Sequence, residues 1–590
     1  MRLRTGIAWL AVVVAQSAAA ADWPTYLADP QRSGVTTEAL AMPLRAAWTW
    51  RSILAPRPAW PSPADLPGLV QVVGFDKAYQ PVVAAGRVLF GSSADDTVYC
   101  LDAATGRELW TYTTEGPIRI APTVTEGRVV VPSDDGYLYC LGAEKGELLW
   151  RCRVAPEERR IPGNGRMISA WPVRCGVVVK DGIAYAAAGL FPPYGVSICA
   201  VRVDTGKEVW RQTAKFPCQG YMVAMNDWLV APSGRTAPHM YDRNTGGYVK
   251  PVPGFRNLGG TYSTAFDDLL MHDFSESGGG LMAFQPATGA YLVHHKGMGR
   301  RMVAGKDLAF IVSPDSLEAF DRAAIRARQL ASKWRVPFKD GHALALAGAL
   351  VLVGGDKRVA AFQSADGKEA WSAAVDGTVH GVAVAGGRLF VSTDTGMLYC
   401  FAKTAGGAAA PAKIAPVPGP GVSADSAALI TKIATAAARS SGSAKGYCLV
   451  AGVGSGFMAT ELARMTAMQV VCVESNPVRI AEARAFLRAR GLYGSRVVIH
   501  RLDGARLPYA DGLMNLVVSE SLIETGEMPV GSDEIGRVLR PCGGVLAVGG
   551  AGGVVKTSAL EVWGRGLPEW KVEAGAMVWA TARRGKHDGA

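Results

Sequence analysis

The sequence predicts two domains of different fold class, an all-β repeat domain followed by an α/β domain with a parallel sheet. A pattern with a period of about 40 residues recurs through the first two thirds of the chain, and such a period is typical of β-propeller blades. A stretch rich in Ala, Pro and Gly follows the repeats. Beyond it, a Gly-rich turn joins an apolar strand to a helix, and strands then alternate with helices, as expected of a parallel sheet.

Length and composition agree with this division. The chain has 590 residues, several times the size of one ordinary domain. Hydrophobic residues make up 49% and charged residues 19%, and 70 glycines suit many short strands joined by tight turns. The net charge of +11 comes from 62 basic and 51 acidic residues that are dispersed rather than gathered into a basic, aromatic-rich stripe. We therefore predict no nucleic-acid partner.

Residues 1–21 have the pattern of a cleavable signal peptide. Arg2 and Arg4 precede an apolar run over 7–14, and small residues over 17–21 offer an Ala-x-Ala cleavage site. The mature chain would begin near Asp22 and be exported to the periplasm or the extracellular space. The apolar run is too short to span a membrane, and no later stretch reaches about 18 uninterrupted apolar residues, so no transmembrane segment is predicted.

The repeat is clearest in two consecutive copies that end on a tryptophan. Val98-Tyr-Cys-Leu-Asp-Ala-Ala-Thr-Gly-Arg-Glu-Leu-Trp110 aligns with Leu138-Tyr-Cys-Leu-Gly-Ala-Glu-Lys-Gly-Glu-Leu-Leu-Trp150, a step of 40 residues. Glycine supplies the positive φ of a tight turn, and we expect the tryptophan to dock between neighbouring blades. Four cysteines are expected at equivalent positions of separate blades, as buried apolar side chains rather than disulfides: Cys100, Cys140, Cys199 and Cys400.

Looser copies extend the array to eight. Five of them retain the turn or the tryptophan, over 203–210, 241–246, 283–289, 319–334 and 361–371. The eighth, from Gly387 to Cys400, stops before its tryptophan-bearing strand, while an unassigned strand from Leu44 to Trp50 precedes the first copy. We predict that this N-terminal strand completes the last blade, because a closed ring leaves no exposed sheet edge.

Residues 22–403 resemble the pyrroloquinoline-quinone-like propeller family, to which the outer-membrane assembly lipoprotein and the quinoprotein alcohol dehydrogenases are related. The opening Asp22-Trp-Pro-Thr-Tyr-Leu-Ala-Asp-Pro-Gln-Arg-Ser-Gly34 and Ser233-Gly-Arg-Thr-Ala-Pro238 are similar to segments of bacterial members. The resemblance implies an eight-bladed propeller that binds protein partners.

The resemblance does not imply a bound quinone. In the quinoprotein dehydrogenases a disulfide between adjacent cysteines covers the quinone, and Asp, Glu and Asn hold a calcium ion. This sequence has no adjacent Cys pair and no recognisable calcium set. Its cysteines also match no haem or zinc motif. We therefore expect no dehydrogenase activity dependent on this quinone, and no metal or haem.

Residues 404–422 are predicted to form a linker, 423–585 a second domain and 586–590 a tail. The linker is rich in Ala, Pro and Gly and has no hydrophobic periodicity. A helix is expected over 423–438, and the residues from Gly446 onward alternate between strands and helices. We expect the linker to leave two separate cooperative cores.

The segment from Tyr447 to Ala463 carries three glycines after an apolar strand, Gly452, Gly454 and Gly456. Glycines at this edge let a backbone approach a ligand closely. A dinucleotide fingerprint requires another glycine where Phe457 stands, so nicotinamide binding is disfavoured. The second strand ends on Glu474, placed to accept hydrogen bonds from ribose hydroxyls. The third runs into Asp503, Gly504 and Ala505.

This second domain resembles the Rossmann-like class I methyltransferases that depend on S-adenosylmethionine. The resemblance implies that the three glycines line the methionine and ribose, that Glu474 binds the ribose, and that Asp503 with Gly504 and Ala505 contacts the adenine. Three positions depart from the family pattern: Val450 stands where an acid is usual, Asn515 where Asp is usual, and Cys542 where Gly is usual. These departures predict reduced or lost affinity for the cofactor.

Two functions stay open. The first is an exported enzyme that transfers a methyl group to an acceptor that no motif names. The second is a non-catalytic propeller scaffold with a vestigial methyltransferase fold, which export favours because S-adenosylmethionine is made in the cytoplasm. No catalytic residue is assigned. Glu520, just past the fourth strand, would face the methyl group, although a surface position is equally compatible with the sequence. The oligomeric state is not predicted.

Overall fold

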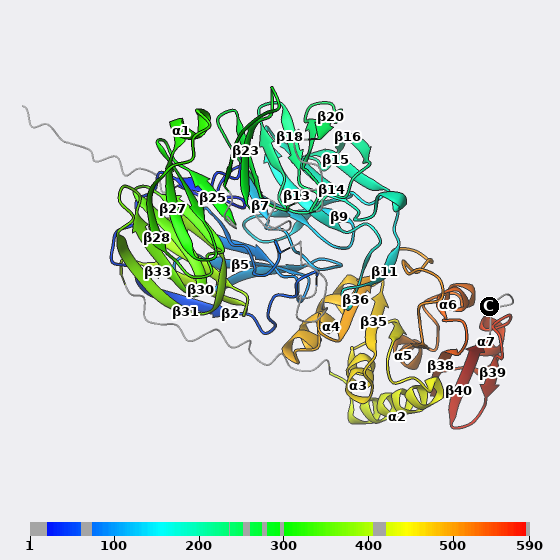
Figure 1. The fold of residues 1–590 in the computed structure, drawn as a ribbon. Helices are drawn as coiled ribbons and strands as arrows, with labels where there is room; N and C mark the ends of the chain where they lie inside the picture. The colour runs from blue at the N-terminus through cyan, green and yellow to red at the C-terminus, as the bar shows by residue number, and fades with distance from the viewer. Residues whose placement is uncertain are drawn as a thin grey trace, which may run out of the picture.

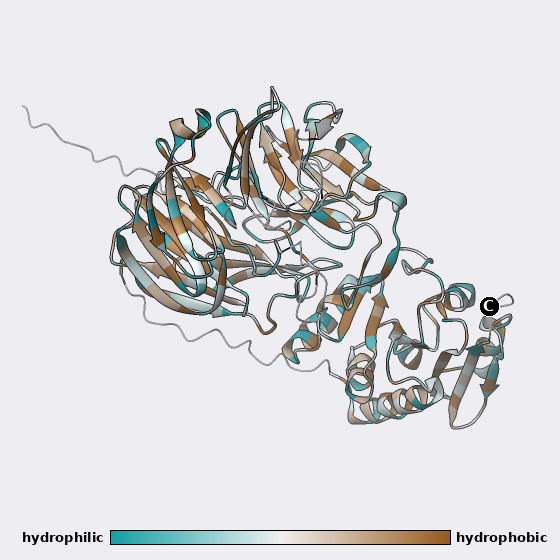
Figure 2. Cartoon of the chain, viewed as in Figure 1, coloured by the Kyte–Doolittle hydropathy of each residue, from teal (hydrophilic) through white to brown (hydrophobic). Residues whose placement is uncertain are grey.

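The computed structural model describes residues 21–60, 74–234, 236–251, 260–273, 280–295, 300–404 and 421–585. Most of the predicted signal peptide and linker, and the whole of the predicted tail, lie outside these residues. The described chain forms a β-propeller and a smaller α/β domain (Figure 1). Apolar residues are concentrated along the strands, and hydrophilic residues on the turns (Figure 2). Within the described residues, helices long and apolar enough to cross a membrane are absent.

The propeller has eight four-stranded blades, as the sequence predicts. In each of the first six blades, successive strands pair with their neighbours along the chain. These strands are β3 (Val82–Ala84), β4 (Arg87–Gly91), β5 (Thr97–Asp102), β6 (Glu108–Thr113), β7 (Thr123–Thr125), β8 (Arg128–Pro132), β9 (Tyr137–Gly142), β10 (Leu148–Arg153), β13 (Val173–Lys180), β14 (Ile183–Ala188), β15 (Val196–Arg202), β16 (Glu208–Ala214), β17 (Val223–Met225), β18 (Trp228–Ala231), β19 (His239–Asp242), β20 (Tyr248–Pro251), β21 (Ser263–Phe266), β22 (Leu269–Asp273), β23 (Leu281–Gln285), β24 (Ala290–His295), β25 (Arg301–Ala304), β26 (Leu308–Val312), β27 (Ser316–Asp321) and β28 (Ser332–Pro337).

The last two blades form one continuous sheet because one long strand, β31, belongs to both, and the N-terminal strand closes the ring. The strands are β29 (Ala343–Ala347), β30 (Leu350–Gln363), β31 (Glu369–Ala385), β32 (Arg388–Thr393), β33 (Met397–Ala402) and β2 (Arg45–Arg51). Strand β2 pairs antiparallel with β33, with Trp48 opposite Cys400 and Trp50 opposite Leu398. The predicted closure of the eighth blade by the N-terminal strand is therefore confirmed.

Tryptophans lock neighbouring blades together, also as predicted. Trp48 donates its indole N–H to the Ala103 carbonyl, and its ring packs so closely on Gly106 that a Cβ there would lie 2.6 Å from the ring. The same pairing of an indole with a glycine joins Trp110 to Gly146 and Trp150 to Gly206. Glycine is needed at these turns both for its positive φ, 72° at Gly106, and for the space that the ring occupies.

The cysteine alignment is correct for three of the four residues. Cys100, Cys140 and Cys400 each pair with the blade's tryptophan on the adjacent strand, at Trp110, Trp150 and Trp48. In the third blade the residue opposite Trp210 is Ala200, and Cys199 pairs with Arg211 instead. Cys199 therefore lies one residue before the position that the repeat pattern predicts, because the residue type recurs in this blade one place away from the strand register. All four thiols are buried and free.

The segment before β2 crosses the centre of the ring. The first strands of successive blades line this centre, and the segment bonds to most of them in turn. Backbone hydrogen bonds join Trp23 to Val83, Pro24 to Val124, Pro30 to Ala224, Gln31 to Ala265 and Gly34 to Leu346, and β1 (Val35–Thr36) pairs with β29. The buried Arg32 guanidinium donates to the carbonyls of Val177 and Met222. The opening segment therefore satisfies inner strand edges that would otherwise be unpaired.

The second domain contains one seven-stranded sheet in the order β36-β35-β34-β37-β38-β40-β39, with only β40 antiparallel to its neighbours. The predicted parallel α/β fold is confirmed, and the sheet ends in an antiparallel hairpin of its last two strands. Its elements are α2 (Ala424–Ser441), β34 (Tyr447–Ala451), α3 (Phe457–Met465), β35 (Gln469–Glu474), α4 (Pro477–Ala489), β36 (Val497–Arg501), β37 (Leu516–Val518), α5 (Ser521–Thr525), α6 (Ser532–Val538), β38 (Gly544–Ala551), α7 (Thr557–Trp563), β39 (Lys571–Glu573) and β40 (Met577–Arg584).

Candidate functional site

The Gly-rich turn lies at the carboxyl edge of the parallel sheet, between β34 and α3. Gly452, Gly454 and Gly456 all have positive φ, of 74°, 54° and 83°. Two of them are packed directly by their own chain. A Cβ at Gly452 would lie 2.0 Å from Ser521 Oγ, and one at Gly454 would lie 2.8 Å from Glu520 Cγ. Close packing within the domain is therefore already a sufficient reason for glycine at 452 and 454, whereas Gly456 has ordinary contacts.

Glu474 ends the adjacent strand β35 and is 8% exposed. Its Oε1 accepts hydrogen bonds from the backbone N–H groups of Ser475 (2.9 Å) and Asn476 (3.0 Å), which fix the carboxylate at the strand end. Among the described residues, no hydrogen bond reaches Oε2. The side chain is thus held in place with one oxygen left to accept from a ligand hydroxyl.

The loop after β36 carries the other predicted residues. Asp503 is half-exposed. Its Oδ2 lies 2.5 Å from Nη2 of Arg151 in the propeller, and its Oδ1 lies 2.8 Å from Nε of Arg501. Gly504 has a φ of 92° with open space around its Cα, and Ala505 is exposed. Because β36 neighbours β35, all the predicted residues lie along one sheet edge. The Asp503 carboxylate, however, is engaged by the propeller, which the sequence did not indicate.

Glu520 is fully buried, and the surface position that its sequence context allowed is wrong. It is 0% exposed because its side chain turns back into the Gly-rich turn. Oε1 accepts from the Ser455 backbone N–H at 2.9 Å and from the Ser455 hydroxyl, and Oε2 accepts from the Met458 N–H at 2.9 Å. Burial raises the pKa of Glu520 to about 7, although these hydrogen bonds act in the opposite direction.

The three departures from the family pattern have different structural settings. Val450 is fully buried within β34. Asn515 accepts a hydrogen bond from the Tyr447 N–H at 3.1 Å, which ties the start of β34 to the residue before β37. Cys542 is exposed at a φ of 60°, a region in which glycine is favoured over a residue with a Cβ.

The two domains contact each other through helix α4 and strand β36. Arg484 donates to Glu115 Oε1 at 2.8 Å, and the Arg501 N–H donates to Glu115 Oε2 at 2.7 Å. Arg488 donates to the hydroxyls of Thr97 (2.6 Å) and Thr113 (2.8 Å). Burial alone would raise the pKa of Glu115, but Arg484 and Arg160 outweigh it and lower that pKa. These contacts fasten one edge of the second domain to the first blade and to the connection that follows it.

A propeller hairpin, β11 (Arg160–Gly163) and β12 (Arg166–Ser169), reaches the second domain (Figure 1). The Arg160 N–H donates to the Pro508 carbonyl at 2.7 Å, and the Ala510 N–H donates to the Arg160 carbonyl at 3.0 Å. Met167 belongs to the same apolar cluster as Tyr509. The hairpin thus adds a short strand pairing to the domain contact.

A cavity of about 740 Å³ opens at this junction. Both domains line it with charged side chains. Its charged lining comprises Arg151, Arg159, Arg160, Arg501, Arg506, Arg537, Glu115, Glu157, Glu158, Asp503 and Asp511.

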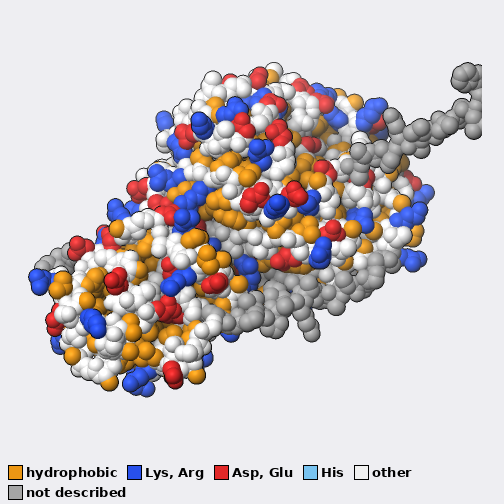
Figure 3. Space-filling model, turned by 180° about the vertical axis from the view of Figure 1, so that it is seen from behind, with side chains coloured by type: hydrophobic (Ala, Val, Ile, Leu, Met, Phe, Trp, Pro, Cys, Tyr) orange, Lys and Arg blue, Asp and Glu red, His pale blue; other side chains and the backbone are white. Residues whose placement is uncertain are grey.

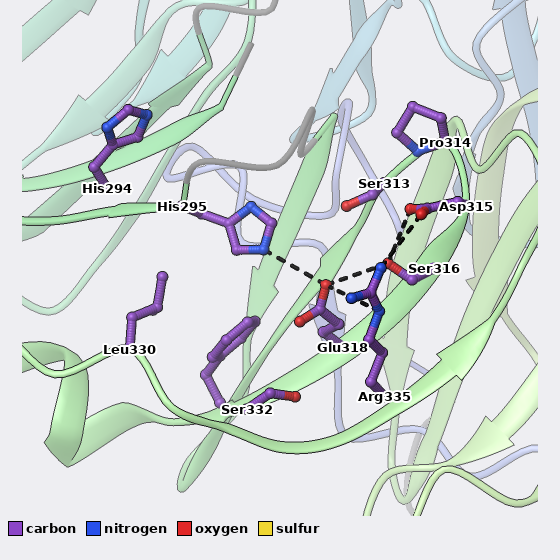
Figure 4. A pocket seen from close by; sticks show the side chains of 11 residues that line it. His294, His295, Ser313, Pro314, Asp315, Ser316, Glu318, Leu330, Ser332 and Arg335 are labelled. Atoms are coloured by element: carbon purple, nitrogen blue, oxygen red, sulfur yellow. Dashed lines mark hydrogen bonds and ion pairs between the residues drawn. The ribbon is translucent and has the colours of Figure 1, made fainter.

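A second cavity, of about 700 Å³, lies between the fifth and sixth blades (Figure 4). Val293 occupies the position that tryptophan holds in six of the other blades, so the indole lock is missing here. His295 points toward Glu318 at 3.6 Å, and Arg335 lies 3.8 Å from Glu318 and 3.3 Å from Asp315. Arg335 thus contacts both carboxylates of this second cavity.

Within the described ranges, no group of three His, Cys, Asp or Glu side chains is arranged to hold a metal ion. On the face seen from behind, Lys and Arg side chains are interspersed with Asp and Glu, which agrees with the dispersed charge of the sequence (Figure 3).

Comparison with known proteins matches each domain to a family. Residues 48–217 and 313–409 match the model of outer membrane protein assembly factor BamB, and residues 448–543 match that of a methyltransferase domain. Two curated relatives are the outer membrane protein assembly factors BamB of Yersinia pestis, 26% identical over 178 residues, and of Burkholderia pseudomallei, 33% identical over 112 residues. The alignments cover 29% and 19% of this chain, and the chain spans only 40% and 26% of these relatives.

Two solved structures are also similar. BamB from Moraxella catarrhalis has a TM-score of 0.44 at 15% identity, covering 61% of this chain and 100% of that one. Quinohemoprotein alcohol dehydrogenase from Comamonas testosteroni has a TM-score of 0.49 at 14% identity, covering 71% and 85%.

Proposed function

We propose that this chain, which combines a repeat domain of the BamB type with a methyltransferase domain, is an exported protein whose second domain binds S-adenosylmethionine. The proposal rests chiefly on Glu474. This carboxylate ends the strand beside the Gly-rich turn, is held by two backbone N–H groups, and has Oε2 left to accept from a ribose hydroxyl. A carboxylate oxygen that accepts from a hydroxyl forms a strong, charge-assisted hydrogen bond.

Within this proposal the chain's own residues bind and orient the ligand. Glu474 would hold the ribose, and the turn of Gly452, Gly454 and Gly456 would lie under the methionine and ribose. Asp503, Gly504 and Ala505 would border the adenine. When bound, the cofactor supplies an activated methyl group. Methyl transfer depends largely on positioning, so no general base needs to be assigned, and the acceptor stays undefined.

A second candidate is a non-catalytic scaffold whose propeller binds proteins. One observation favours it: the Glu520 carboxylate already bonds to the N–H groups of Ser455 and Met458 at the turn. Backbone donors at a helix start are suited to anionic ligands, and here the chain uses them itself. Export also separates the protein from the cytoplasmic supply of S-adenosylmethionine.

Calorimetric titration with S-adenosylmethionine distinguishes the two candidates. We expect the parent chain to bind, and Glu474→Ala to bind about ten-fold more weakly or worse, because hydrogen bonds to an ionised group contribute about 1.5–3 kcal/mol each. Glu482→Ala serves as the matched control, since Glu482 is exposed on helix α4 of the same domain.

Two results would decide against cofactor binding as described. Absence of heat from the parent at millimolar ligand would leave the scaffold as the better account. Equal affinities for the parent and Glu474→Ala would show that Glu474 does not hold the ribose.

A further inference from the structure

The cavity at the domain junction has walls that are fixed by both domains. On the propeller side, Arg160 is buried and donates to the Glu115 carbonyl at 2.6 Å, in addition to its backbone bonds to Pro508 and Ala510. Arg166 anchors the same hairpin through two bonds to the Asp96 carboxylate, of 2.5 and 2.6 Å. The bonds between Arg160 and residues 508 and 510 therefore fasten the segment that carries Arg159 to the segment that carries Arg506.

Most of the cavity's charges are already paired. Arg151 and Arg501 share Asp503. Arg537 binds Asp511 at 2.7 Å and Glu534 at 2.7 Å. Two further carboxylates are also bound, Glu115 by Arg484 at 2.8 Å and Glu158 by Arg160 at 3.6 Å.

Two guanidinium groups of the cavity lining, one from each domain, have no ion-pair partner among the described residues. Arg159 of the propeller and Arg506 of the second domain are exposed cavity residues that form no ion pair within the described chain. Arg537 lowers the pKa of Asp511 through a hydrogen bond, and the nearby positive charges of Arg506 and Arg159 lower the same pKa further. Glu157 is the one lining carboxylate without an arginine partner among the described residues, so the cavity keeps a surplus of positive charge.

We propose that this cavity binds a small anion, bearing phosphate or carboxylate groups, between Arg159 and Arg506. A guanidinium presents paired N–H donors that match the oxygens of either group. Because the two arginines belong to different domains, the anion would bridge the propeller and the second domain. The cavity shares Asp503 with the proposed cofactor site but does not include Glu474, and anion binding between the two arginines does not require the cofactor.

Titration of the full chain with inorganic pyrophosphate and with succinate at constant ionic strength tests the proposal. We expect at least one anion to bind, and the one that binds identifies phosphate or carboxylate chemistry. Arg159→Gln and Arg506→Gln should each weaken binding at least five-fold. Arg107→Gln and Arg540→Gln, at exposed arginines away from the cavity, should leave the affinity unchanged.

Glu157→Gln provides a test in the opposite direction. Removing the unpaired carboxylate should tighten binding, because it increases the surplus positive charge. The proposal is wrong if neither anion binds at millimolar concentration, if the Arg159 and Arg506 variants bind like the parent, or if Glu157→Gln leaves binding unchanged or weaker. None of these readouts involves S-adenosylmethionine.

Discussion

The Gly-rich turn is filled by a side chain of the protein itself, because Glu520 packs against Gly454 and accepts hydrogen bonds from Ser455 and Met458. The spacing of Gly452 and Glu474 follows from strand and turn lengths, which are local properties. The orientation of Glu520 depends on its packing against Gly454 from a strand that is distant in sequence. Gly454 is consequently a poor site for testing ligand binding, since any side chain there would first displace Glu520.

Burial of Glu520 should make the stability of the second domain depend on pH. Its pKa is about 7 in the folded state against an ordinary value of 4.5, so the folded state binds the proton more tightly. The free energy of unfolding should therefore fall as pH rises from about 4.5 to about 7 and be level, for this group, outside that window. Relative to Glu520→Gln, the parent should lose about 2–3 kcal/mol between pH 5 and pH 8.

Chemical denaturation of the parent and Glu520→Gln at the two pH values measures this difference. Glu482→Gln, at an exposed position, should track the parent at both. A constant difference between parent and Glu520→Gln across the range would mean that Glu520 titrates normally and is not buried as an acid.

At the scale of elements, the blades were predictable because their determinants repeat locally. The turn glycine and the docking tryptophan recur at fixed spacing. The prediction fails at Cys199, where the third blade carries a cysteine one position away from the residue that pairs with the tryptophan. The loss of the lock at Val293 was visible in the sequence as a missing tryptophan. The path of the opening segment through the ring was not predictable, because its bonds join distant blades.

The tryptophan lock on the closing strand should be a large contributor to propeller stability. Trp48 is 2% exposed, packs on Gly106 and donates to the Ala103 carbonyl at 3.1 Å. Trp48→Ala should destabilise the propeller by about 3–5 kcal/mol, as truncation of a buried aromatic residue does. Trp48→Phe keeps an aromatic ring and loses the indole hydrogen bond, so its effect should be smaller. Thermal melting compares the variants, and a Trp48→Ala propeller that melts like the parent would contradict the lock.

At the scale of the whole molecule, the sequence predicted two domains and a linker but not the interface between them. The docking residues are scattered, from Glu115 in the propeller to Arg484 and Arg488 on helix α4, and no local pattern marks them. The backbones of the two domains also approach each other closely. A Cβ at Gly494 of the second domain would lie 2.1 Å from the carbonyl oxygen of Ala94 in the propeller. The expectation of two separate cooperative cores did not anticipate this direct contact.

The interface should depend on the ion pair between Arg484 and Glu115, whose side chains are only 11% and 12% exposed. Removing one partner of such a pair leaves the other buried without compensation, at a cost of about 3–5 kcal/mol. The double variant Arg484→Ala/Arg488→Ala also removes the bonds to Thr97 and Thr113, so we expect the domains to separate while each core stays folded. Small-angle X-ray scattering should then show a larger radius of gyration than for the parent.

Arg479→Ala is the matched control, because Arg479 lies on the same helix but pairs with Glu524 inside the second domain at 3.1 Å. Unchanged scattering from the double variant would show that the hairpin contacts of Arg160 and Met167 hold the domains together without helix α4.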